Sequence, residues 1–158
     1  MKQPWVSFVT DNPGQATDGP FAGELAHPRA FGAMARVLAK YVRDEHLLTL
    51  EEAVRRMTSL PARRVRLLDR GLLVPGLAAD LVVFDLERVR DVATFEKPLQ
   101  YSEGFSHVVV NGRLVLDDGT VLPGRHDGMA AFRGRGGNVV LVVDPGAAVV
   151  HGVAARDA

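Results

Sequence analysis

The sequence predicts an α/β protein, and three observations carry that prediction. Residues 5–11 form an apolar run of β-branched and aromatic residues, which is typical of a short buried strand. Apolar residues then recur at helical spacing up to about residue 68, whereas residues 81–116 contain short apolar runs separated by turn residues. Helices followed by strands favour two structural neighbourhoods over one uniform fold. We divide the chain into residues 1–68, 69–132 and 133–158.

The composition is that of a globular protein of about one domain, with 158 residues, 47% of them hydrophobic and 24% charged. Lysine plus arginine equals aspartate plus glutamate at 19 each, so no global basic field would attract nucleic acid or an anionic membrane. The chain has no cysteine, which excludes disulfides and cysteine zinc ligands within it. No apolar run resembles a signal peptide or a membrane span. We expect a cytoplasmic protein with no nucleic-acid or membrane partner.

The first apolar run, Trp5 to Asp11, ends in a carboxylate and is broken by the turn residues Asn12-Pro13-Gly14. Catalytic groups of α/β barrels lie at the carboxyl ends of buried strands, which makes Asp11 a candidate catalytic residue. Aspartate also forms turns by bonding its own backbone, so the sequence around Asp11 leaves a purely structural role open.

A long stretch rich in proline and glycine, residues 12–27, separates this run from the first helix and is predicted to be a functional loop. The helix opens at His27-Pro28-Arg29, because proline is tolerated in the first turn of a helix. Its apolar stripe indicates one buried face. The stripe consists of Phe31, Met34, Ala35, Leu38, Tyr41 and Val42.

A capping box marks the second helix. The Thr49 hydroxyl can accept a hydrogen bond from the Glu52 N–H, while the Glu52 carboxylate reaches back to Thr49. A third, short helix is predicted from Ser59 to about Leu68.

The second region is predicted to be β-rich. A buried strand is expected at residues 81–85, and Asn111-Gly112 between two apolar runs is a strong signal for a β-hairpin. Asp118-Gly119 offers another turn before Val121-Leu122. The glycine-rich tail contains one further candidate strand, residues 139–143.

These motifs, in this order and spacing, resemble the C-terminal third of the N-acyl-D-amino-acid deacylases of the amidohydrolase superfamily. The resemblance covers about residues 4–125, and the tail after Arg125 departs from the family pattern. The motifs that carry it are Pro4–Asp11, His27–Arg29, Arg36–Leu38, Thr49–Ala62, Asp69–Gly71, Pro75–Gly76, Ala79–Asp85, Ala93–Glu96 and Val110–Gly112.

The resemblance implies a zinc-dependent hydrolase of N-acyl-D-amino acids or related cyclic amides, built on a (β/α)8 barrel beside a small β-sandwich-like domain. Residues 1–68 would then be the last barrel strand, the active-site loop and the following helices, and residues 69–132 part of the small domain. Asp11 takes the position of the aspartate that moves a proton from the zinc-bound water to the leaving amine, and it is a candidate metal ligand. His27 and Arg29 are candidate substrate-binding residues. For His27 the structural alternative is a hydrogen-bonding loop histidine. Arg29 would contact the substrate carboxylate or an acidic neighbour, and its structural alternative is a solvated arginine at a helix start.

The family's other metal ligands, a His-x-His pair, a cysteine and later histidines, would all precede Met1. No two histidines of this chain are spaced i, i+2 or i, i+4, and a zinc site needs three or four converging ligands. We therefore expect the chain alone to lack the zinc site and to be inactive by itself. Its histidines are His27, His46, His107, His126 and His151.

Two interpretations follow. In the first, the chain is the C-terminal piece of a zinc amidohydrolase that acts with a missing N-terminal half. In the second, it is a non-catalytic module, or a truncated gene product, that binds a partner through open β edges, and Asp11 is a turn residue. Apolar faces left uncovered would also favour self-association.

Overall fold

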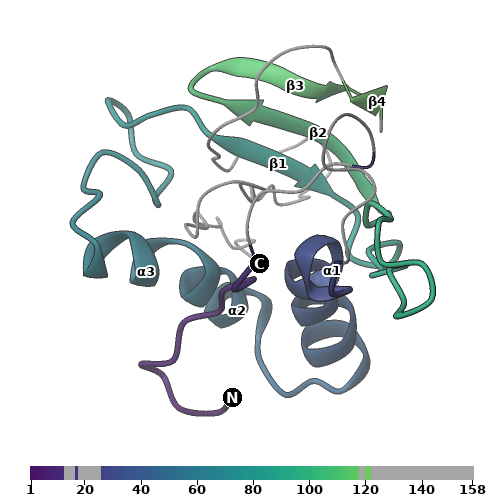
Figure 1. Ribbon diagram of the computed structural model, residues 1–158. Coiled ribbons are helices and arrows are strands. Elements are labelled where there is room, and N and C mark those ends of the chain that lie inside the picture. Colours follow the sequence, from purple (N-terminus) through teal and green to yellow (C-terminus); the bar gives the residue numbers. More distant parts are fainter. Residues whose placement is uncertain (13–16, 18–25, 118–119, 122–158) are drawn as a thin grey trace.

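A computed structural model describes residues 1–12, 17, 26–117 and 120–121 of the chain. A group of helices packs beside a four-stranded antiparallel sheet (Figure 1). The predicted 118–119 turn, most of the 12–27 loop, the candidate strand at 139–143 and the rest of the tail lie outside the described residues. No helix of the described part is long and apolar enough to cross a membrane.

The first helix begins where the sequence predicts. Helix α1, Arg29–Arg36, follows Pro28 and continues into the π-helix η2, Val37–Asp44. The predicted stripe is confirmed at four positions that are buried, with its two aromatic residues partly buried. These four are Met34, Ala35, Leu38 and Val42.

The π-helical turns of η2 have no counterpart in the sequence prediction. Arg43 of η2 reaches the loop after the first strand, where its Nη1 donates to the carbonyl oxygens of Leu86 (3.0 Å), Glu87 (3.3 Å) and Val89 (2.7 Å). This side chain ties the helices to the sheet region.

The second helix has one half of the predicted capping box. Thr49 Oγ1 accepts from the Glu52 N–H at 3.3 Å, at the start of α2, Leu50–Met57. The Glu52 carboxylate, however, binds Arg55 and Arg56. One half of the capping box is confirmed, and the carboxylate has other partners.

The third helix is shorter than predicted. Helix α3 spans Ser59–Arg64 and does not extend to Leu68. Arg66 has a positive φ of 61°, the Leu67 N–H donates to Ala62 O at 2.9 Å, and the Arg66 N–H donates to Arg63 O at 3.2 Å. These are the two bonds of a Schellman motif, which ends a helix at a left-handed residue and usually uses glycine there. The arginine at this position gave no stop signal in the sequence.

The strands run in the order β1-β2-β3-β4, with each neighbouring pair antiparallel. The predicted hairpin is confirmed, because Asn111 (φ 48°) and Gly112 (φ 79°) both have the positive φ that a type I′ turn requires. The strands are β1 (Leu81–Phe84), β2 (Phe105–Val110), β3 (Arg113–Asp117) and β4 (Thr120–Val121).

One hydrophobic core joins the helices to β1. Leu38 of η2 and Val54 and Met57 of α2 are fully buried in the same cluster as Leu81 and Val82 of β1. Burial of apolar side chains from both the helices and the sheet is the main stabilising term of such a fold.

The prediction of a buried strand at residues 5–11 is wrong for this structure. The segment is extended but belongs to no sheet, and Trp5 and Val9 are 61% and 54% exposed. A strand is stable when a neighbour satisfies its backbone, and no described strand lies beside this segment. The described residues likewise contain no parallel barrel sheet and no second sheet, so the barrel and sandwich details of the prediction stay predictions.

Candidate functional site

The structure brings together two of the three candidate residues, Asp11 and Arg29. Arg29, the first residue of α1, places its Nη2 3.2 Å from Asp11 Oδ2 and 2.9 Å from the Asp11 carbonyl oxygen. The backbone of Asp11 is left-handed, with φ 51°, a conformation that aspartate tolerates better than most residues. The arginine thus holds both the side chain and the backbone at the end of residues 1–11.

His27 contacts the first residue of α1, the helix that carries Arg29. Its Nδ1 accepts a hydrogen bond from the Arg29 N–H at 3.1 Å. The ring packs edge-on against Phe95, with 5.1 Å between ring centroids. His27 therefore orients the first turn of α1, which carries Arg29.

The ion pair between Asp11 and Arg29 is accessible. The Asp11 side chain is 80% exposed and that of Arg29 is 45% exposed. Exposed pairs of this kind contribute about 0 to 1 kcal/mol, because water competes for both partners. Either group can therefore exchange its partner for a ligand at small cost.

The described residues do not fit a zinc ion. No group of three or more histidine, cysteine, aspartate or glutamate side chains in this part of the chain is arranged to hold a metal. Among the described residues, the charged group that contacts the Asp11 carboxylate is a guanidinium, whereas zinc needs three or four nitrogen, sulfur or oxygen ligands. His126 and His151 lie outside the described residues. The proposed ligation by Asp11 stays a prediction.

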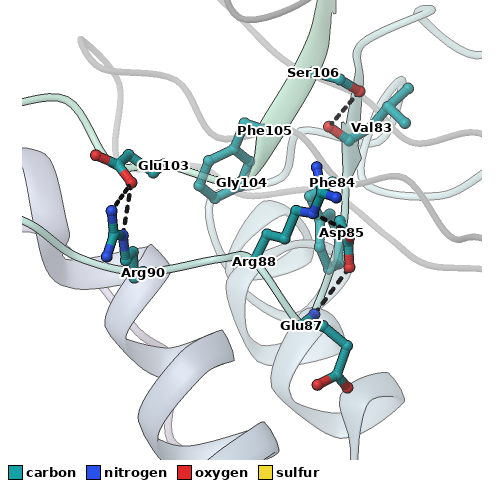
Figure 2. A pocket seen from close by; sticks show the side chains of 10 residues that line it. All are labelled: Val83, Phe84, Asp85, Glu87, Arg88, Arg90, Glu103, Gly104, Phe105 and Ser106. Atoms are coloured by element: carbon teal, nitrogen blue, oxygen red, sulfur yellow. Dashed lines mark hydrogen bonds and ion pairs between the residues drawn. The ribbon is translucent and has the colours of Figure 1, made fainter.

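A hollow of about 560 Å³ lies beside the end of β1 and the start of β2 (Figure 2). Four of its five charged side chains are paired: Arg88 Nε lies 3.3 Å from Asp85 Oδ2, and Arg90 Nε donates to Glu103 Oε2 at 2.6 Å. None of the three candidate residues lines it. Because most of these charged side chains already have partners in the described part of the chain, the hollow offers little free charge to a ligand.

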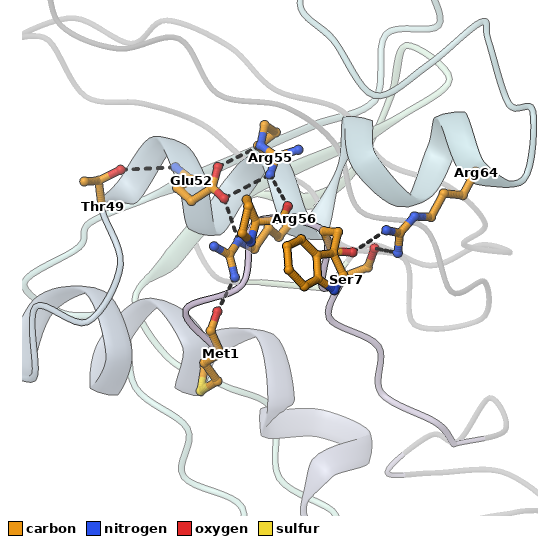
Figure 3. Close-up of polar contacts among 9 residues, drawn as sticks. Met1, Ser7, Thr49, Glu52, Arg55, Arg56 and Arg64 are labelled. Carbon is orange, nitrogen blue, oxygen red and sulfur yellow. Dashed lines mark hydrogen bonds and ion pairs between the residues drawn. The ribbon is translucent and has the colours of Figure 1, made fainter.

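A polar network that the sequence analysis missed connects residues 1–8 to the helices (Figure 3). Its centre is Glu52, whose Oε2 accepts from Arg55 Nε and whose Oε1 accepts from Arg56 Nε, both at 2.7 Å. Hydrogen bonds from Arg55, and then from Arg56, lower the pKa of Glu52 to about 2. Clustered arginines at the end of a helix were the available signal, but their partners lie some 50 residues away in the chain.

The comparisons with known proteins agree with the sequence resemblance. Residues 5–116 match the amidohydrolase family. The chain is 55% identical over 90 residues to an N-acyl-D-glutamate deacylase of Alcaligenes xylosoxydans xylosoxydans, an alignment that covers 57% of this chain and 18% of that protein.

Solved structures agree as well. A crystal structure of D-aminoacylase superposes with a TM-score of 0.61 at 46% identity, covering 64% of this chain and 21% of the other. The N-acyl-D-glutamate deacylase of Bordetella bronchiseptica, solved with zinc and a phosphonate inhibitor, gives a TM-score of 0.55 at 52% identity, covering 56% and 19%.

The chain spans about a fifth of the length of these relatives. Their names are those of deacylases, which are hydrolases acting on C–N bonds, and the resemblance drawn from the motifs is confirmed. Since the family match covers most of the sequence, from residue 5 to residue 116, this chain belongs to the amidohydrolase family.

Proposed function

We propose that this chain provides the proton-transfer aspartate and part of the substrate rim of a deacylase that hydrolyses the amide bond of an N-acyl-D-amino acid or a related cyclic amide. The observation that carries the proposal is the family match, which begins at residue 5 and therefore includes Asp11. The 55% identity to an N-acyl-D-glutamate deacylase supports the substrate class.

The accessibility of Asp11 supports this role. An exposed carboxylate can accept a proton from water and deliver it to the leaving amine nitrogen, which is general acid–base catalysis by a single group. Arg29 would release Asp11 when a substrate carboxylate takes the guanidinium, since bidentate pairing with a carboxylate is what this group favours. His27 would keep the first turn of α1 in place during that exchange.

The metal ligands would come from a segment other than the described residues, since these do not form a zinc site. Zinc is the metal that the Bordetella relative contains. The chain would therefore be inactive by itself, and its partners would be the small-molecule substrate and a missing N-terminal half. We propose the cytoplasm as its location.

The decisive test is complementation. The chain would be co-expressed with the Alcaligenes N-acyl-D-glutamate deacylase shortened by the stretch that this chain matches, and the hydrolysis of N-acetyl-D-glutamate would be assayed with added zinc. We expect turnover from the pair and none from the chain alone. Asp11→Asn should abolish it, whereas the matched control Asp117→Asn, an exposed aspartate of β3, should retain it.

Zinc-dependent turnover by the purified chain alone would show that the account of the missing ligands is wrong. Full activity of the co-expressed pair that carries Asp11→Asn would show that Asp11 takes no part in the proton transfer.

A second function is favoured by a specific observation. Strand β4 is at one end of the sheet order and pairs only with β3 among the described strands, so its outer edge is where a partner strand would add; the strand at the other end, β1, is buried. In this alternative the chain is a non-catalytic module, and the left-handed Asp11 is a turn residue.

Trp5, Val9 and Leu68 are exposed apolar residues, and uncovered surface of this kind favours association with a second copy or a partner. Gel filtration should give a species larger than 17.1 kDa, and a compact monodisperse monomer would count against this part of the proposal.

A further inference from the structure

Residues 1–8 lie along α2 and α3 and are held there mostly by arginine side chains (Figure 3). Arg55 Nη2 donates to the Pro4 carbonyl oxygen at 2.5 Å, and Arg56 Nη1 donates to the Met1 carbonyl oxygen. The Phe8 N–H donates to the Arg56 carbonyl oxygen at 3.2 Å. These three backbone groups are thus bonded to residues of α2 and not to a neighbouring strand.

Glu52 fixes the two guanidinium groups of α2. Its carboxylate accepts from Arg55 Nε and Nη2 at 2.7 and 2.9 Å, and from Arg56 Nε at 2.7 Å. Arg56 is only 2% exposed, and a buried charge is tolerated when it is paired and hydrogen-bonded. The planar guanidinium can bind the carboxylate on one side and a backbone carbonyl on the other, which an ammonium group does less well.

Among the arginine side chains of α2 and α3 that contact residues 1–8, that of Arg64, the last residue of α3, reaches the position nearest to Asp11 in the sequence. Its Nη2 donates to the Trp5 carbonyl oxygen and its Nη1 donates to Ser7 Oγ at 3.1 Å. Ser7 precedes Asp11 by four positions, and Arg29 Nη2 lies 3.2 Å from Asp11 Oδ2. Asp11 thus ends a short stretch of chain that is anchored by an arginine at both ends.

We propose that Arg55, Arg56 and above all Arg64 are positioning residues for Asp11. They fix residues 1–8 on α2 and α3, and so set the point from which the chain extends to the carboxylate. The inference rests on the proposed function, because it gives a catalytic purpose to the placement of Asp11. A carboxylate misplaced by about 1 Å can lose a factor of about 10² in rate, so a loose anchor would affect the chemistry.

The anchor is tested on the full chain without any assay of activity. Trp5 is the only tryptophan, so its fluorescence anisotropy reports the motion of this segment alone. Arg64→Met should lower that anisotropy and speed amide exchange at Phe8 by about tenfold, which corresponds to about 1.4 kcal/mol. Arg64→Lys keeps one charged donor and should restore part of the loss.

The matched control is Arg63→Met, because Arg63 neighbours Arg64 on α3 and has no hydrogen bond or ion pair to the described residues 1–12. It should leave both signals at their wild-type values. Arg55→Met serves as a second variant at a half-exposed site, and avoids the folding defect that loss of the buried Arg56 would bring. Wild-type anisotropy and a wild-type rate of amide exchange at Phe8 in both Arg64→Met and Arg55→Met would show that these arginines do not hold residues 1–8 in place.

The link to Asp11 is tested in the complemented pair described above. Arg64→Met should lower kcat about tenfold and leave KM within about twofold, because the substrate contacts are intact while the carboxylate is displaced. Unchanged kcat in a pair that Asp11→Asn inactivates would overturn the positioning role and leave the proposed function standing. A wild-type pair without activity would overturn the proposed function, and the anchor itself would then be judged by exchange and anisotropy.

Discussion

Two aspartates of this chain, Asp11 and Asp80, are each paired with an arginine, and their surroundings give the two pairs different roles. Asp80 is fully buried and accepts from Arg70 Nη1 at 2.6 Å and from the Asn111 N–H at 2.7 Å. Asp11 is largely exposed and contacts Arg29 at 3.2 Å. The buried carboxylate joins the loop before β1 to the β2–β3 turn, whereas the exposed one is free to exchange its partner. The same residue type thus serves stability in one region and is available for chemistry in the other.

The largest effect on stability is expected for Asp80→Ala, which removes the buried pair. Removing the buried carboxylate leaves Arg70 without its closest partner and the Asn111 N–H without an acceptor, so we expect a loss of about 3 kcal/mol of unfolding free energy. Urea unfolding followed by circular dichroism measures it. A loss below about 1 kcal/mol would mean that the Asp80 pair is no stronger than an exposed one.

A smaller effect is expected at the turn that Asp80 holds. Asn111 has a φ of 48° and its Oδ1 accepts from Arg70 Nη2 at 3.0 Å, so Asn111→Ala should cost about 1 to 2 kcal/mol through backbone strain and the lost acceptor. Asn111→Gly is the control, because glycine relieves the strain and loses only the side-chain bond. Equal unfolding midpoints for the alanine and glycine variants would show that the left-handed conformation is not the cause.

Glu52 adds a dependence on pH to the comparison. Its pKa in the folded chain is about 2, below the ordinary 4.5, so its contribution to stability is present above pH 4.5 and is lost as the pH falls toward 2. Solvent reaches the Glu52 carboxylate, so we expect it to contribute about 1 kcal/mol to the free energy of unfolding. Acid unfolding of the wild type and of Glu52→Gln measures it. Parallel stability curves of the two proteins between pH 5 and pH 2 would contradict the assignment.

The smallest effect on stability is expected for Asp11→Ala, the counterpart of Asp80→Ala. The exposed pair with Arg29 should contribute less than about 1 kcal/mol, so the unfolding midpoint should stay close to that of the wild type. Destabilisation as large as that of Asp80→Ala would give Asp11 a structural role and argue against its availability for catalysis.

Local signals in the sequence predicted the structure well. The Thr49 cap, the Asn111-Gly112 hairpin and the buried stripe of the first helix depend on residues within a few positions of each other, and the structure confirms them. Such features follow from backbone geometry and hydrophobic periodicity, which a single sequence records.

Features that depend on distant partners were missed. Residues 5–11 have the composition of a buried strand, yet without a neighbouring strand among the described residues they lie on the helices. The contacts of Arg55, Arg56 and Arg64 with residues 1–7 join positions more than 50 apart, and the end of α3 falls at an arginine in a conformation usually taken by glycine. Of the candidate site, the sequence indicated Asp11, Arg29 and His27, and it offered an acidic neighbour as one partner of Arg29 without identifying that neighbour as Asp11.

Arg43 links the helical region to the β-rich region of the chain. Its guanidinium crosses from the helices to three carbonyl oxygens after β1, over a core that both regions share. Neither region keeps a complete core or satisfied carbonyls without the other, so the two should open together in a single cooperative transition. A cut near residue 68 would therefore not release two independent folding units, whatever evolutionary boundary lies there.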